Sequence, residues 1–176
     1  HNPAHQSSLS NNVVVSLLID HENIVWIGAY YGGLNRYDGK KFVRYVHDPA
    51  NPRSLGDDNV WEIREDSNHN LWLGTLKGGV DVYDRKKNEF YHYRSGDVNS
   101  IHTSYVPAIM EDRQGNMWIG TGYGLEVLEK QSGRFVHYLN NPKDPSSISD
   151  NSILGVIEDS RGLIWIGTQR GLNLFN

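Results

Sequence analysis

The sequence contains no cysteine, which excludes disulfide bonds, thiolate metal sites and a cysteine nucleophile. It also lacks an apolar stretch near 18 residues and a secretory signal at its start, so we expect this segment neither to span a membrane nor to direct its own export. Positive charge is not in excess, because 17 Lys and Arg stand against 21 Asp and Glu. A net charge of −4 gives no reason to expect contact with nucleic acid or an anionic membrane.

No segment shows a sustained helical periodicity of hydrophobic residues. The sequence instead contains a repeat. A Trp followed by an aliphatic residue and Gly occurs four times, at Trp26, Trp72, Trp118 and Trp165. The intervals are 46, 46 and 47 residues. A period near 45 residues with one Trp in each unit is typical of a repeat array.

Alignment on the Trp resolves each unit into four short β segments, except that the last unit stops before its fourth. The first segments lie at 14–20, 60–66, 106–112 and 153–159, the second at 24–28, 71–75, 117–121 and 164–168, the third at 34–37, 80–83, 125–128 and 172–175, and the fourth at 42–45, 90–93 and 135–138.

The turn between the first and second segments ends on Asn23, His69, Gly115 or Gly162. These residue types tolerate a positive φ best. We therefore expect a tight hairpin with one left-handed residue in every unit.

Four-stranded antiparallel units of this length, with Gly and aromatic punctuation, are β-propeller blades. The predicted fold is all-β, and residues 1–176 form a partial propeller of about four blades, at about 11–46, 57–94, 103–139 and 150–176, the last without its fourth strand. The linker phrase at 48–55 and 141–148 also occurs at 1–9, so the chain starts in phase with the repeat. We expect the chain to be a segment of a larger propeller, and the alternative is a homodimer that closes a ring of about eight blades.

Residues that recur in register are expected to build the scaffold. One blade cannot bury both faces alone, so the four Trp should lie between stacked blades. The Gly two residues after each Trp shares its strand face and should leave room for a bulky neighbour. These glycines are Gly28, Gly74, Gly120 and Gly167.

The segments VIEDSRGLIWIGTQRGLNLF (156–175) and IREDSNHNLWLGTLKGGVDVYD (63–84), with the linker NPKDPSSISDNSI (141–153), resemble two-component regulator propeller repeats. The resemblance covers nearly the whole chain and implies the periplasmic sensor region of a Bacteroidetes hybrid two-component system. It implies two successive seven-bladed propellers, a β-sandwich, a transmembrane helix, and histidine kinase, receiver and DNA-binding modules, with oligosaccharide as the signal. This chain carries none of the downstream modules, so kinase activity cannot reside in it.

Catalytic and metal chemistry find little support in the sequence. The pairs Glu65-Asp66, Glu111-Asp112 and Glu158-Asp159 recur before the same turn, where Asp bonds nearby backbone, and adjacent strand residues point to opposite faces. The eight His show no metal-ligand spacing, and His92 and His137 share a register position on the fourth strand, where exposure is expected. No phosphate-binding loop, nucleophile elbow or dinucleotide motif occurs, so we predict no metal, no cofactor and no enzyme activity.

Ligand-binding residues are expected at loop positions where the four units differ from one another. In propellers the loop between the second and third strands and the loop entering the first strand open on one face. Aromatic rings beside cationic and amide groups suit a sugar. The candidate ligand residues are Tyr30, Tyr31, Trp61, Lys77, Tyr105, Tyr123 and Arg170.

We therefore expect a non-catalytic sensor segment in the periplasm that binds oligosaccharide and passes the signal to a downstream kinase. Its partners would be other blades and domains of the same polypeptide or a second copy, and it would meet a membrane only through the parent protein. Two alternatives stay open: a carbohydrate-active propeller lyase or hydrolase, and a scaffold for protein–protein contacts.

Overall fold

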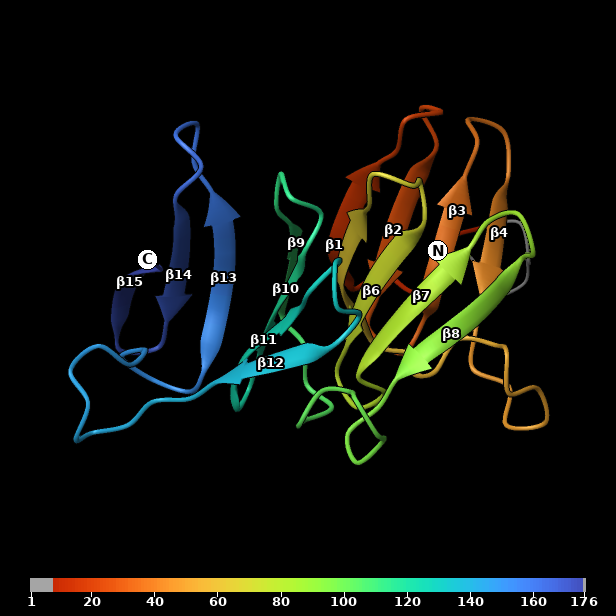
Figure 1. Cartoon of the computed structure of the whole chain (residues 1–176). Coiled ribbons are helices and arrows are strands. Elements are labelled where there is room, and N and C mark those ends of the chain that lie inside the picture. The colour runs from red at the N-terminus through yellow and green to blue at the C-terminus, as the bar shows by residue number, and fades with distance from the viewer. Residues whose placement is uncertain (1–7, 176) are drawn as a thin grey trace.

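The computed structural model describes residues 8–175, and every regular element in that range is a β-strand (Figure 1). The expectation that the chain opens on the linker phrase at 1–9 therefore falls mostly outside the described residues. No helix in the described range is long and apolar enough to span a bilayer. The strands are β1 (Val14–Ile19), β2 (Val25–Ala29), β3 (Gly33–Tyr37), β4 (Phe42–Tyr45), β5 (Val60–Glu65), β6 (Leu71–Thr75), β7 (Val80–Asp84), β8 (Glu89–Tyr93), β9 (Ala108–Glu111), β10 (Met117–Thr121), β11 (Gly124–Leu128), β12 (Phe135–Tyr138), β13 (Ile153–Glu158), β14 (Ile164–Thr168) and β15 (Gly171–Phe175).

The strands form four separate antiparallel sheets, each with neighbours in sequence order. Blades 1, 2 and 3 have four strands and blade 4 has three, so the predicted all-β architecture of propeller blades is confirmed. The first strands of successive blades, β1, β5, β9 and β13, contact one another. Because each blade is an up-and-down meander, the turns after the first strands lie at one end, and the linkers between blades lie at the other (Figure 1).

The turn after each first strand follows the expected chemistry. Asn23, His69, Gly115 and Gly162 have φ values of 61°, 67°, 84° and 85°, which confirms one left-handed residue in every hairpin. The Asp that opens the turn accepts backbone N–H groups across it, for example from Asn116 to Asp112 at 2.8 Å. Its second oxygen accepts the indole N–H of the Trp six residues later, at 2.7–3.1 Å in all four blades.

Several strand boundaries differ by one or two residues from those expected. The first strand of blade 3 begins at Ala108 and not at position 106, because Pro107 has no N–H to donate to the ladder. The third strands of blades 1, 3 and 4 begin on the Gly itself, for example Gly33. In three blades the first strand also carries a bulge near its start, at Val15, Trp61 and Leu154.

The core lies between blades, where the Trp face of one packs on the next. Trp26 of blade 1 packs with Ile63, Leu73 and Tyr83 of blade 2. The same arrangement joins Trp72 to blade 3 and Trp118 to blade 4. These three Trp are buried, as predicted, whereas Trp165 on the outer face of blade 4 is only half-buried.

The Gly after each inter-blade Trp leaves the space that the sequence predicts. A Cβ on Gly28 or Gly74 would come 2.5 Å or 2.3 Å from the backbone oxygen of Val60 or Val106 in the following blade. A Cβ on Gly120 would meet a methyl of Ile153 at 2.6 Å. Around Gly167 the nearest such atom lies 3.8 Å away, so at this Gly the outer face of blade 4 is uncrowded.

The Glu of each Glu-Asp pair links consecutive blades. Glu65, Glu111 and Glu158 accept the backbone N–H of the first turn residue of the preceding blade, at 2.6–2.9 Å. Blade 1 has Ile19 at this position, and its side chain is exposed. The Asp of each pair therefore serves the turn, as its recurrence indicated, and the Glu makes a contact between blades that the sequence did not predict.

Candidate functional site

The linker end of the blades gathers four of the predicted ligand residues into one aromatic row. Tyr31 and Tyr30 come from the β2–β3 loop, Trp61 from the bulge in β5, and Tyr105 from the linker before β9. Ring centroids are 4.4 Å apart for Tyr31 and Tyr30, 6.4 Å for Tyr30 and Trp61, and 6.0 Å for Trp61 and Tyr105. The row therefore crosses blades 1, 2 and 3.

Backbone geometry fixes the exposed end of this row. Tyr31 has a φ of 51°, which is uncommon for a bulky residue, and its side chain is 65% exposed. Its backbone N–H donates to Oδ1 of the buried Asn59 at 3.0 Å. Hydrogen bonding with Tyr31 raises the pKa of Tyr30, so the Tyr30 phenol is protonated and able to donate at neutral pH.

The middle and far end of the row are held differently. Trp61 is the residue that the β5 bulge leaves out of the strand ladder, since the register shifts between Val60 and Glu62. Tyr105 accepts the backbone N–H of Gly122 at 3.1 Å through its own carbonyl. A Cβ on Gly122 would lie 3.1 Å from the Tyr105 ring, so the missing side chain lets this ring pack against the β10–β11 loop.

Three other predicted residues lie at the same end but outside the row. Lys77 is exposed, and its backbone N–H donates to Asp57 at 2.6 Å. Tyr123 is 57% exposed, and Arg170 forms an exposed ion pair with Asp150 at 3.3 Å. Among the described residues, none of these three makes a ring contact with the row.

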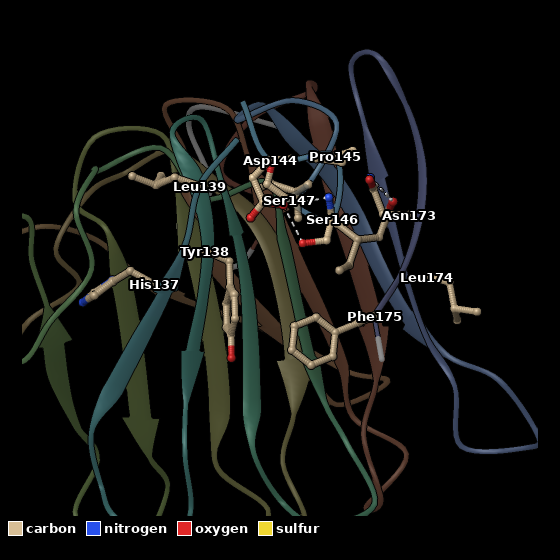
Figure 2. Close-up of a pocket in the computed structure, with 12 residues that line it drawn as sticks. His137, Tyr138, Leu139, Asp144, Pro145, Ser146, Ser147, Asn173, Leu174 and Phe175 are labelled. Atoms are coloured by element: carbon tan, nitrogen blue, oxygen red, sulfur yellow. Dashed lines mark hydrogen bonds between the residues drawn. The ribbon is translucent and has the colours of Figure 1, made fainter. Parts of the chain in front are cut away.

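A sizeable cavity lies elsewhere and has a structural origin. Its volume is about 810 Å³, and its lining includes Tyr138 of β12, the linker around Ser147 and Phe175 of β15 (Figure 2). The matching space in blade 3 holds β12, whose Phe135 packs on Tyr93 at 5.2 Å. Within the described residues no strand lies along this edge of β15. We therefore attribute the cavity to the place of a fourth strand and not to a ligand.

Two clusters were not predicted from the sequence, because their members come from different strands, turns and linkers. His21, Glu65 and His69 meet where blades 1 and 2 adjoin, and His102, Glu126 and His137 meet in blade 3. In each cluster one ligand atom per residue lies within 4.8 Å of the others. The only hint in the sequence was the shared register of His92 and His137.

The expected exposure of His92 is wrong. Its side chain is 13% exposed, because Nδ1 lies 2.6 Å from Asp81 and Nε2 lies 3.0 Å from the carbonyl oxygen of Pro52. The Asp81 carboxylate raises the pKa of His92. This imidazole is thus committed to joining β8 to β7 and to the preceding linker.

Stacked four-stranded meanders of this kind define a β-propeller. Two-component regulator propeller repeats match at 8–31, 54–77, 99–123 and 147–170, which together exceed half of the chain. The chain belongs to the two-component regulator propeller family. No curated protein sequence matches it.

Solved structures support the same assignment. The extracellular domain of a protein described as a hybrid two-component system, BT3049 of B. thetaiotaomicron, superposes with a TM-score of 0.85 at 25% identity, over 100% of this chain and 24% of that one. The extracellular domain of BT4673 from the same organism gives 0.81 at 23% identity, over 98% and 22%. A streptogramin B lyase structure gives 0.62 at 16% identity, over 93% and 54%, and shares the fold alone. The chain spans about a quarter of the length of these two extracellular domains.

Proposed function

We propose that this chain is a non-catalytic propeller segment in the extracytoplasmic sensor region of a hybrid two-component protein, and that its aromatic row binds oligosaccharide. Family membership and the likeness to extracellular domains of such systems support the first part. The proposal that the segment binds oligosaccharide rests on the aromatic row. We place the segment in the periplasm, as part of a polypeptide whose kinase lies beyond this chain.

The chemistry of the row suits sugars. Apolar faces of pyranose rings stack on Tyr and Trp, while phenol and indole groups bond hydroxyls. Four rings spread over three blades offer contact to more than one sugar unit. Because Asn59 holds the backbone N–H of Tyr31, the backbone that carries this ring needs little ordering when a ligand binds.

Two carboxylates of the linker that leads to Trp61 are engaged by backbone groups, which favours binding over catalysis at these residues. Asp57 accepts the N–H groups of Asn59 and Lys77, and Asp58 accepts that of His47. A hydrolase or lyase needs acid and base groups that face the substrate. These carboxylates instead hold the loops in place. The sensor interpretation is therefore preferred to the carbohydrate-active enzyme.

The signal would pass through a change in the arrangement of blades or domains. A ligand can shift such an equilibrium only through contacts that differ between the two states. The outer faces of blades 1 and 4, which expose Leu17 and Leu172, are proposed to meet further blades of the same polypeptide, with a second copy as the alternative.

Alanine substitution of the row in the full-length protein tests this function. We expect Tyr31→Ala and Trp61→Ala each to weaken binding on an array of plant and host oligosaccharides by about tenfold, since each loses a stacking ring worth about 1.4 kcal/mol. Tyr91→Ala is the matched control, because Tyr91 is an exposed tyrosine of β8 outside the row. Unchanged glycan binding in both row variants would refute the assignment.

A further inference from the structure

A carboxylate or amide on each third strand holds the linker that enters the same blade. Backbone N–H groups of the linkers donate to it at 2.6–3.0 Å. Blades 1 and 4 use Asn35 and Asn173, and blades 2 and 3 use Asp81 and Glu126. Since an amide oxygen is sufficient for this bond, the negative charge in blade 3 requires another explanation.

Glu126 is 1% exposed, and a buried carboxylate is costly unless cations or hydrogen bonds surround it. Within the described residues its ion pairs are with two imidazoles, those of His102 and His137, and with no Lys or Arg. Asp81 has one imidazole, His92, and that ring has both nitrogens engaged. The carboxylate in blade 3 therefore contacts one imidazole more than the equivalent carboxylate in blade 2.

The His102–Glu126 distance suits two ligands of one metal ion, whereas the closer contact of His137 with Glu126 is that of a hydrogen bond. Nδ1 of His102 lies 3.3 Å from Oε1 of Glu126, and Nδ1 of His137 lies close to Oε2. Two ligands about 2.1 Å from a tetrahedral zinc ion are about 3.4 Å apart. The two imidazole rings lie 3.8 Å apart between centroids, so both converge on the same carboxylate.

We propose that His102, Glu126 and His137 form a binding site for a divalent transition metal, of which zinc is the representative. Imidazole nitrogen with a carboxylate is a ligand set that zinc accepts. The His102 and His137 side chains are 51% and 30% exposed, which leaves solvent access for a water as fourth ligand. This departs from the sequence-based expectation that the chain binds no metal.

The second cluster is a less suitable site. Oε1 of Glu65, the atom nearest to both His21 and His69, also lies 3.0 Å from Nη2 of Arg85. A guanidinium at that distance repels a cation and occupies the carboxylate. The two clusters contain the same residue types but differ in this charge and in the burial of the Glu, whose side chain is 14% exposed in Glu65 and 1% exposed in Glu126, so the His21 cluster serves as a control.

A metal here would fasten the linker to its blade. His102 belongs to the linker, Glu126 to β11 and His137 to β12, so one ion would join three segments. Tyr105, the end of the aromatic row, follows His102 by three residues. Binding to the folded form would also raise the melting temperature.

Calorimetric titration of the untagged chain with zinc chloride tests the proposal. We expect one equivalent bound and a higher melting temperature. His102→Ala should weaken binding by about tenfold or more, whereas His21→Ala should leave it unchanged. Glu126→Gln keeps an amide oxygen for the linker N–H, as in blades 1 and 4, and should also lose zinc.

A cobalt(II) titration gives a second readout, in which intense visible absorption marks a four-coordinate site with imidazole ligands. The proposal is overturned if the wild-type chain binds no zinc at about 0.1 mM, a concentration well above the dissociation constants of specific zinc sites in proteins. It is equally overturned if zinc is retained by folded Glu126→Gln and His102→Ala but lost from His21→Ala.

Discussion

At the scale of single residues, one aspartate in each blade connects the turn to the core. Asp112 accepts the N–H of Asn116 with one oxygen and the indole N–H of Trp118 with the other. Burial by itself would raise the pKa of Asp112, but the bonds from Trp118 and Asn116 outweigh it and lower the pKa below its ordinary value. The folded state therefore stabilises the ionised form.

Removal of this carboxylate should be costly. Asp112→Ala leaves the buried indole N–H of Trp118 without its acceptor, and we expect a loss of about 2–3 kcal/mol in the free energy of unfolding. Urea unfolding followed by tryptophan fluorescence measures it. Asp97→Ala, on an exposed loop, is the control and should change the free energy by less than about 0.5 kcal/mol.

The difference between wild type and Asp112→Ala should also depend on pH. A carboxyl with a lowered folded-state pKa contributes stability above its unfolded pKa, and that contribution disappears as pH falls through the folded value. The gap should thus be full at pH 7 and shrink below the ordinary aspartate pKa of 3.8. A gap that stays constant down to pH 2 would contradict this account.

At the scale of elements, the second strand of each blade is shaped by its contact with the next blade. The Trp supplies apolar area and the Gly two residues later admits the neighbouring strand. Gly120 lies against Ile153 of β13, whereas Gly167 of β14 faces no such neighbour within the described residues. Identical motifs therefore have different tolerance for a side chain.

Valine substitution separates the two positions. Gly120→Val should lower the melting temperature by about 5 °C or more, because its side chain overlaps Ile153 and forces the blades apart. Gly167→Val should change the melting temperature by less than about 2 °C, since a Cβ at this position would make only ordinary van der Waals contact. Differential scanning calorimetry decides, and equal effects at both sites would refute the role of Gly120 in spacing blades.

At the scale of the molecule, stability comes from stacking and so depends on position in the array. The three buried clusters each join two blades, and each contains the Trp of the earlier blade. The outer face of blade 4 exposes Ile157, Leu172 and Leu174 around the half-buried Trp165. Equivalent residues thus contribute unequally.

Truncation of two equivalent tryptophans measures this inequality. Trp118→Ala should cost about 3–5 kcal/mol, the usual range for a buried aromatic side chain. Trp165→Ala should cost less than about 2 kcal/mol, because its ring packs on one side only. Urea unfolding midpoints give the comparison, and costs that agree within error would show that stacking does not dominate.

Much of the fold was accessible from the sequence because the repeat samples each local rule four times. The left-handed turn residues, the Trp-bearing strands and the role of the Asp in each Glu-Asp pair follow from short-range chemistry, whereas the Glu contacts the preceding blade. The start of β9 was predicted two residues too early, because the effect of Pro107 on the strand was not considered. The bulge at Trp61 was not predicted, because a bulge depends on the pairing of β5 with β6. The functional surface was found only as candidates.

The sequence by itself determined the repeat, the strand content and the blade architecture, since turn chemistry and the alternation of side chains are local properties. Only the tertiary structure decided that Tyr31, Tyr30, Trp61 and Tyr105 form a row while Tyr123 stands apart. It also decided that His102 and His137 meet at Glu126. These groups are separated by 11 to 75 residues along the chain, or are neighbours whose orientation the backbone sets. The stacking of blades assembles the row, whereas the pairing of β11 with β12 and the packing of the linker on β11 assemble the His102 cluster.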